Sequence, residues 1–210
     1  MPSRVSEAFV LRSYPFQEGD LVVSFFTRDQ GRLRGVAKRA RRPKGSFGST
    51  LERLSQVRIG YHQKETVELV RIDSCELVQS QFGLADCYEA GIALDFIAEV
   101  SDQLLPAAEP NERFYRLIAA VLADLRDSRE RGVWRAVTYF SYWAVRLSGF
   151  LPDLRVSAES RLLAEHIATR PVVELAAMDW PKRTASDLRR FLTRELEAHV
   201  ERRLATVPLL

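Results

Sequence analysis

The sequence is poor in cysteine and has no long apolar segment. Its 210 residues include two cysteines, Cys75 and Cys87, which are too few for a disulfide scaffold or a four-cysteine zinc site. The longest uninterrupted apolar run, residues 117–123, is far shorter than the roughly 20 residues that span a bilayer. The N-terminal segment lacks the charged, apolar and small-residue parts of a secretory signal. We therefore expect a cytoplasmic protein in a reducing setting, without a membrane span.

Sequence motifs of catalysis and of metal binding are also missing. There is no GxxxxGK[ST] phosphate loop, no GxGxxG at the start of a helix and no GxSxG elbow. The three histidines, His62, His166 and His199, are scattered and lie far from the cysteines, whereas a metal site normally contains a local pair of such ligands. The sequence therefore predicts no catalytic residues, no metal and no cofactor, and a function that is not enzymatic.

Positive charge, in contrast, is concentrated in one part of the chain. The net charge is only +3, but residues 1–82 carry 14 basic and 9 acidic residues, whereas residues 83–210 carry 17 and 19. Residues 28–44 alone hold eight basic side chains and one acid, Asp29, which amounts to +7 over 17 residues. Such a cluster repels itself unless anions come near it, so we interpret it as a phosphate-binding surface.

Residues 1–82 have the pattern of a small β domain. Short segments rich in β-branched and aromatic residues predict five strands, with turn-forming residues between them. The four residues from Arg28 to Gly31 suit a hairpin turn between the second and third strands. Five short antiparallel strands favour a closed barrel, because closure removes exposed sheet edges. We expect the strands at residues 9–11, 21–27, 31–38, 56–61 and 66–72.

Beyond Phe82 the apolar residues recur at helical spacing and predict five helices. Ser157 and Ser186 are the expected N-caps of the last two. Strands followed by helices indicate an α+β chain, which we divide into a barrel domain, residues 1–82, and an all-helical domain, residues 83–210.

The basic cluster is the predicted nucleic-acid interface. A charge run is usually a solvated surface, but this one spans a strand and the following loop of a predicted barrel and lies near aromatic residues. Barrels that bind single strands use cations to contact phosphates and rings on which bases stack. We predict that Phe47, in the loop, stacks on a base. The predicted phosphate contacts are Arg32, Arg34, Lys38, Arg39, Arg41, Arg42 and Lys44.

Several short motifs have a familiar order along the chain. They are Glu18 with Asp20 in a polar turn, Phe26-Thr27 at a strand end, Gly31-Arg32 after a turn, Ala37-Lys38 followed by basic residues through Arg42, and the segment GFLPDL at residues 149–154. This arrangement resembles the bacterial RecO family of recombination mediators. The specific motifs cover about a quarter of the chain, and the general layout covers all of it.

The resemblance implies an OB-fold barrel followed by a helical domain, and a function in DNA repair. RecO proteins bind single- and double-stranded DNA and anneal complementary strands. With the partner RecR they help to load the recombinase RecA onto strands coated by single-strand-binding protein, which would place this protein at the nucleoid. Many relatives hold zinc with four cysteines after the Pro-x-Leu segment, whereas this chain has Arg155, Val156 and Ser157, so no zinc module is expected. Relatives also commonly have glycine at the position of Arg39.

The helical domain is the expected site of protein partners. Its net charge is −2, and its last predicted helix carries Arg189, Arg190 and Arg194, which we expect either to bind the acidic C-terminal tail of single-strand-binding protein or to be solvated surface charge. Two alternative functions stay open. One is a protein-interaction adaptor whose basic loop docks on an acidic partner, and the other is an RNA-binding OB-fold protein.

Overall fold

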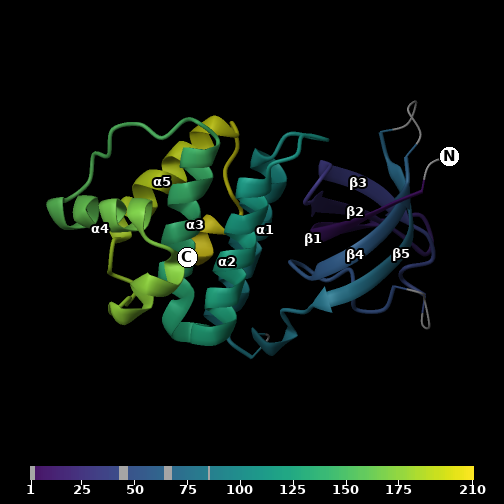
Figure 1. Ribbon diagram of the computed structural model, residues 1–210, viewed down its shortest axis with the longest axis horizontal. Coiled ribbons are helices and arrows are strands. Elements are labelled where there is room, and N and C mark those ends of the chain that lie inside the picture. The colour runs from purple at the N-terminus through teal and green to yellow at the C-terminus, as the bar shows by residue number, and fades with distance from the viewer. Residues whose placement is uncertain (1–2, 43–46, 64–67, 85) are drawn as a thin grey trace. The chain divides into compact units, whose positions relative to one another are not determined.

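The computed structural model describes residues 3–42, 47–63, 68–84 and 86–210 (Figure 1). They group into two compact units. The first, which we call the sheet unit, comprises residues 1–82 and 101–115, and the second, the helical unit, comprises residues 83–100 and 116–210. The sequence pattern did not indicate that residues 101–115 belong with the sheet. The division into two domains at residue 82 stays a prediction.

The described residues form five strands followed by five α-helices, as the α+β prediction expects. The strands are β1 (Ser3–Phe16), β2 (Asp20–Thr27), β3 (Gly31–Ala37), β4 (Gln56–His62) and β5 (Val70–Gln79). The helices are α1 (Tyr88–Leu104), α2 (Glu112–Ser128), α3 (Val133–Leu147), α4 (Ala158–Thr169) and α5 (Ser186–His199). Short 3-10 turns lie at Phe82–Leu84, Arg129–Gly132, Val172–Ala177 and Val207–Leu209.

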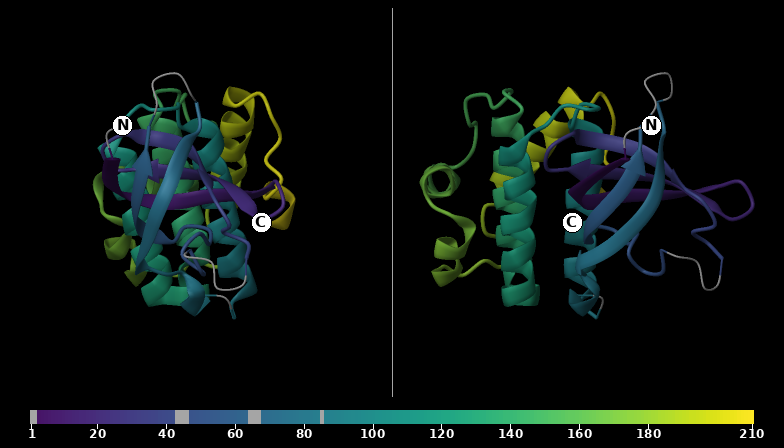
Figure 2. Two further views of the ribbon diagram at one scale, coloured as in Figure 1. Left: turned by 90° about the vertical axis from the view of Figure 1, so that its right-hand side faces the viewer. Right: turned by 45° about the vertical axis from the view of Figure 1, so that its right-hand side comes forward.

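The five strands close into a ring in the order β1-β2-β3-β5-β4, in agreement with the predicted OB fold. All neighbours are antiparallel except β3 and β5, which are parallel. The predicted hairpin between β2 and β3 is confirmed, and the Thr27 hydroxyl closes it with a 2.9 Å hydrogen bond to the Gly31 carbonyl. β1 is much longer than predicted. It pairs with β4 through Phe9 and continues with β2 as a hairpin, whose tip extends away from the ring (Figure 2).

Alternate side chains of the strands fill the interior of the ring. Phe25 on β2 and Tyr61 on β4 are fully buried, and their rings meet edge to face at 5.9 Å. Gly35 allows β5 to approach β3, because a Cβ atom at this position would lie 2.7 Å from Val70 Cγ2 and 2.9 Å from the Val70 carbonyl oxygen. Any larger residue would therefore force the parallel strand pair apart.

Residues 101–115 cover part of the outer face of the sheet. Phe26 points outward from β2, yet it is fully buried because its ring packs against those of Phe114 and Tyr115, with centroid distances of 6.1 and 6.0 Å. Strand alternation alone predicts that only one of the neighbours Phe25 and Phe26 is in a core. Both are buried, one on each face of β2.

Helix α3 is the centre of the helical unit. Twelve of its 15 residues are buried, and it contacts both α4 and α5. The predicted N-cap of α4 is confirmed, since the Ser157 hydroxyl accepts a 3.2 Å hydrogen bond from the Ser160 amide. The predicted cap of α5 is wrong, because Ser186 is the first helical residue and Ala185, at φ 51°, precedes it. No helix in the described ranges has the length and apolar character that a bilayer crossing requires.

Candidate nucleic-acid interface

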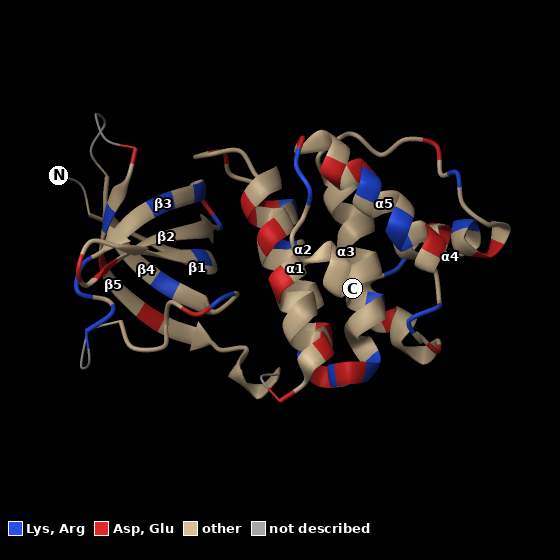
Figure 3. Cartoon of the chain, turned by 180° about the vertical axis from the view of Figure 1, so that it is seen from behind, with Lys and Arg blue, Asp and Glu red and all other residues tan. Residues whose placement is uncertain are grey.

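The loop after β3 carries four exposed basic residues, Lys38, Arg39, Arg41 and Arg42, which we call the basic loop. Arg34, on β3 itself, is exposed as well. Figure 3 marks the basic residues of β3 and of the loop beyond it in blue. None of these five side chains forms an ion pair with another described residue, so their charges are available to a ligand. Lys44, also predicted to contact phosphate, lies outside the described residues.

Backbone hydrogen bonds hold the basic loop against the β1–β2 turn. The Arg39 amide donates to Asp20 Oδ1 at 2.8 Å, and the Arg41 amide donates to the Gly19 carbonyl at 3.0 Å. Arg39 has φ 57°, a left-handed conformation that glycine adopts freely and that costs other residues roughly 1–2 kcal/mol. The backbone of the loop therefore has a conformation suited to glycine at residue 39, although this chain has a cationic arginine there. Because the anchoring uses the backbone, the basic side chains stay free.

Arg32 is a correction to the predicted interface. Its side chain is only 20% exposed, its Nε donates to the Leu105 carbonyl at 2.7 Å, and its guanidinium lies 3.7 Å from Asp102. Residues 101–115 therefore cover Arg32 and provide a carboxylate that neutralises it. The fold thus supplies an anion to Arg32 and leaves its side chain less accessible to phosphate than the prediction assumes.

Phe47 is a second correction. Its side chain is 3% exposed and packs into the core of the ring together with Leu51 and Val57. A ring in this position fills the barrel interior and cannot stack on a base. The prediction that Phe47 is a stacking residue is therefore wrong.

The sequence reasoning missed Arg12, which belongs to the same surface as Arg34. The strand register places both residues opposite Ser24, so the three form one row across β1, β2 and β3. Arg12 is exposed. The signal that could have identified it is the alternation of Arg12, Tyr14 and Phe16, which puts all three side chains on one face of a strand.

In the helical unit Arg189 differs from Arg190 and Arg194 in its burial. Arg189 is 8% exposed, and its guanidinium donates to the carbonyl groups of Thr184 and Lys182 and lies 5.0 Å from the Trp134 ring centre. Burial lowers its pKa to about 10. Its side chain is thus held by contacts within the fold, although it lines the same cavity as Arg190 and Arg194, and its binding of a partner stays a prediction.

Arg190 and Arg194 remain on the surface, where they line a cavity of about 440 Å³. Lys182 and the buried Arg189 bring the cations in its lining to four, Glu197 adds one carboxylate, and Val137 and Val207 add apolar surface. The cavity thus combines apolar walls with basic groups.

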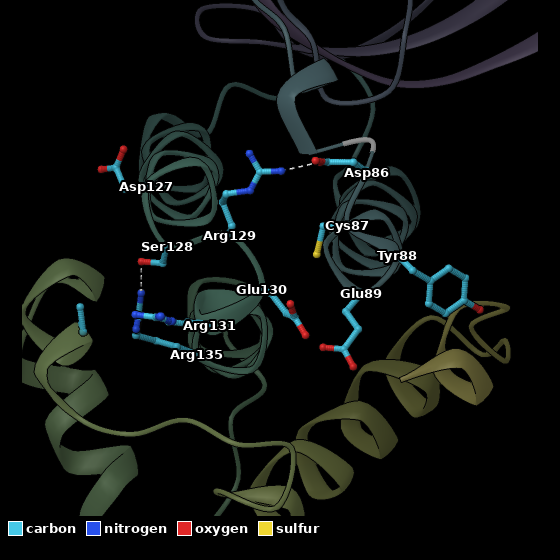
Figure 4. Close-up of a pocket in the computed structure, with 11 residues that line it drawn as sticks. Asp86, Cys87, Tyr88, Glu89, Asp127, Ser128, Arg129, Glu130, Arg131 and Arg135 are labelled. Carbon is cyan, nitrogen blue, oxygen red and sulfur yellow. Dashed lines mark hydrogen bonds and ion pairs between the residues drawn. The ribbon is translucent and has the colours of Figure 1, made fainter.

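A larger pocket of about 1020 Å³ lies in the helical unit and is lined by charges of both signs (Figure 4). Arg129 forms an ion pair with Asp86, and Arg135 donates to the Ser128 hydroxyl at 2.6 Å. The lining holds four carboxylates and three arginines, so the pocket does not select a ligand of one sign. In the described ranges no group of three or more His, Cys, Asp or Glu residues is placed to hold a metal ion.

Comparison with known proteins identifies the family. Residues 1–81 match the family model for the N-terminal region of recombination protein O, and residues 87–162 match the model for its C-terminal region. The chain belongs to the RecO family. It is 39% identical to the DNA repair protein RecO of Koribacter versatilis, over 98% of this chain and 97% of that protein. The identity is 32% to the RecO protein of Syntrophobacter fumaroxidans, over 62% of this chain and 51% of that protein, and 30% to that of Cutibacterium acnes, over 73% and 64%.

The predicted family is thus confirmed, and the chain is a DNA repair protein of the RecO family. The basic loop, Arg12 and Arg34 all fall within the region that matches the N-terminal RecO model. Arg190 and Arg194 lie beyond residue 162, where the match to the C-terminal RecO model ends, whereas Val137 of the same cavity lies within it.

Proposed function

We propose that this RecO-family protein binds single- and double-stranded DNA through the basic loop and Arg34, and acts as a recombination mediator rather than as an enzyme. One observation carries this proposal. Five exposed cations, whose side chains form no ion pair with a described residue, follow one another within nine residues of the chain. A polyanion supplies the counter-charge that such a cluster lacks.

The same electrostatics accounts for annealing of complementary strands. Two single strands repel each other through their phosphates, and a cationic surface lowers that repulsion while the base edges stay free to pair. In this proposal the protein works on nucleoid DNA together with RecR, and it assists the loading of RecA indirectly by delivering strands. Binding and positioning suffice for these steps, and no bond of the nucleic acid is broken.

Replacing Lys38, Arg39, Arg41 and Arg42 with alanine is expected to weaken binding to all DNA sequences alike. Five phosphate contacts give a slope of log affinity against log salt of about −3.5 for single strands, and loss of four reduces it to about −0.7. A fluorescence-anisotropy titration of labelled single-stranded DNA at several salt concentrations measures both slopes.

The matched control removes four exposed arginines of the helical unit, Arg155, Arg170, Arg202 and Arg203, and should leave the slope unchanged. If the slope of log affinity against log salt fell equally in both variants, DNA binding would depend on the net charge of the protein and not on the basic loop. Failure of the unaltered protein to bind DNA would favour the adaptor function, and displacement of DNA by an RNA competitor would favour an RNA-binding function. If the protein keeps its DNA in the presence of the RNA competitor and speeds annealing, the results support the mediator function.

We propose further that the cavity beside α5 takes the acidic C-terminal tail of single-strand-binding protein. Its apolar walls suit a terminal hydrophobic side chain, and Arg190 and Arg194 suit carboxylates. Changing both arginines to glutamate should weaken binding of an acidic tail peptide at least tenfold, because attraction becomes repulsion. Calorimetric titration of the peptide measures this, with Arg202→Glu/Arg203→Glu as the control. Equal affinities in the two variants would exclude this cavity.

A further inference from the structure

The far half of β1 presents a row of rings and cations on the outer face of the sheet. Ser13 points toward the segment after the basic loop, since its hydroxyl donates to the Leu51 carbonyl at 3.0 Å. Arg12, Tyr14 and Phe16 alternate with it and therefore point outward. The guanidinium of Arg12 lies 4.8 Å from the centre of the Tyr14 ring, which confirms that the two share a face.

This face is accessible, unlike the half of the sheet that residues 101–115 cover. Phe16 is 38% exposed and Tyr14 is half-buried, whereas Phe26, on the covered half, is fully buried. Exposed aromatic side chains on a strand are costly to leave in water, so a row of them flanked by cations indicates a binding surface.

The row is continuous with the basic loop. Phe16 stands opposite Asp20 in the β1–β2 hairpin, and Asp20 accepts the hydrogen bond from the Arg39 amide that anchors the loop. At the other end of the row, Arg12 and Arg34 both stand opposite Ser24. The two rings therefore lie between Arg12 with Arg34 at one end and, at the other, Asp20, which holds the backbone of the basic loop.

We propose that Phe16 and Tyr14 form a stacking platform for the unpaired bases of a single DNA strand, whose phosphates contact Arg12, Arg34 and the basic loop. This inference rests on the proposed function and adds a preference for single strands. Rings two residues apart on a strand are separated by about 6.6 Å, which allows adjacent bases to be held in turn. In a duplex the base faces are already stacked on one another, so duplex DNA meets only the cations.

Alanine replacement of Phe16 separates stacking from charge. The Phe16→Ala variant should bind a single strand about tenfold more weakly with an unchanged salt slope, because the variant loses base stacking, which involves no counterion. Its affinity for duplex DNA should not change. Tyr88→Ala is the matched control, since Tyr88 is 76% exposed in the helical unit, and it should bind as the unaltered protein does.

A second measurement uses the unaltered protein and does not depend on the folding of a variant. Irradiation with a single strand that contains 5-iodouracil should cross-link Phe16 or Tyr14, as mapped by mass spectrometry of the digested complex. Cross-links confined to other residues, an unchanged single-strand affinity of Phe16→Ala, or an equal loss of duplex binding would each overturn the platform. These outcomes leave DNA binding intact, whereas absence of DNA binding by the unaltered protein would overturn the proposed function itself.

Discussion

Replacing Asp124 with alanine is expected to lower the free energy of unfolding of the helical unit by about 3–5 kcal/mol. The Asp124 carboxylate on α2 accepts two hydrogen bonds from Arg135 on α3, at 3.0 and 2.8 Å, and both side chains are only 3% exposed. Burial raises the pKa of the Asp124 carboxyl, and the hydrogen bonds from Arg135 oppose that rise. Removal of the carboxylate leaves the guanidinium charge buried without its anion, which is why the expected loss is large.

Urea unfolding followed by tryptophan fluorescence measures this effect, because all three tryptophans, Trp134, Trp143 and Trp180, lie in the helical unit. Asp127→Ala is the matched control on the same helix. Its carboxylate is exposed, so the free energy of unfolding should change by no more than about 0.5 kcal/mol. A loss below about 1 kcal/mol in Asp124→Ala would contradict the importance of the buried pair.

Alanine at Gly31 is expected to destabilise the sheet unit by about 3 kcal/mol or more. Gly31 has φ 75°, which costs another residue roughly 1–2 kcal/mol, and a Cβ atom there would lie 2.3 Å from the carbonyl oxygen of Glu109. The substitution must therefore displace residues 101–115 from the sheet as well as strain the hairpin. Hydrogen exchange should show faster exchange of the amides of residues 105–115, in addition to the lower free energy of unfolding.

Gly48→Ala is the control that separates the two costs. Gly48 has a positive φ of 48°, but a Cβ atom there would have no neighbour within 4 Å among the described residues. The free energy of unfolding of Gly48→Ala should fall only by the roughly 1–2 kcal/mol that backbone strain costs. Hydrogen exchange at residues 105–115 should stay unchanged. If both alanine variants lost the same free energy of unfolding, the close contact between the new Cβ atom at residue 31 and Glu109 would have to be easily relieved.

Local patterns predicted most of the fold and failed where contacts are distant in sequence. The β2–β3 hairpin and the helices followed from turn residues and apolar spacing. Residues 12–16 of β1 were missed because the hairpin tip has no core against its outer face, so they lack the apolar alternation of a strand. The role of residues 101–115 was missed because it depends on contacts such as that between Phe26 and Phe114, which no local pattern contains.

The candidate nucleic-acid interface was likewise predicted from local sequence patterns. The basic loop is exposed as expected, because a turn dense in cations stays in water. Arg32, Phe47 and Arg189 are less accessible than the sequence predicts for a common reason, since each has a partner elsewhere in the fold. These partners are Asp102, the ring core and Trp134 respectively.

The return of residues 101–115 to the sheet has a consequence for synthesis on the ribosome. Tyr115 follows Phe82 by 33 residues, so the strands are complete well before the segment that shields Phe9 and Phe26 has been translated. At about 5–20 residues per second, those two rings remain uncovered on the nascent chain for roughly 2–7 seconds. During that interval the nascent barrel exposes two aromatic rings that the finished chain buries, which leaves it open to association with other apolar surfaces.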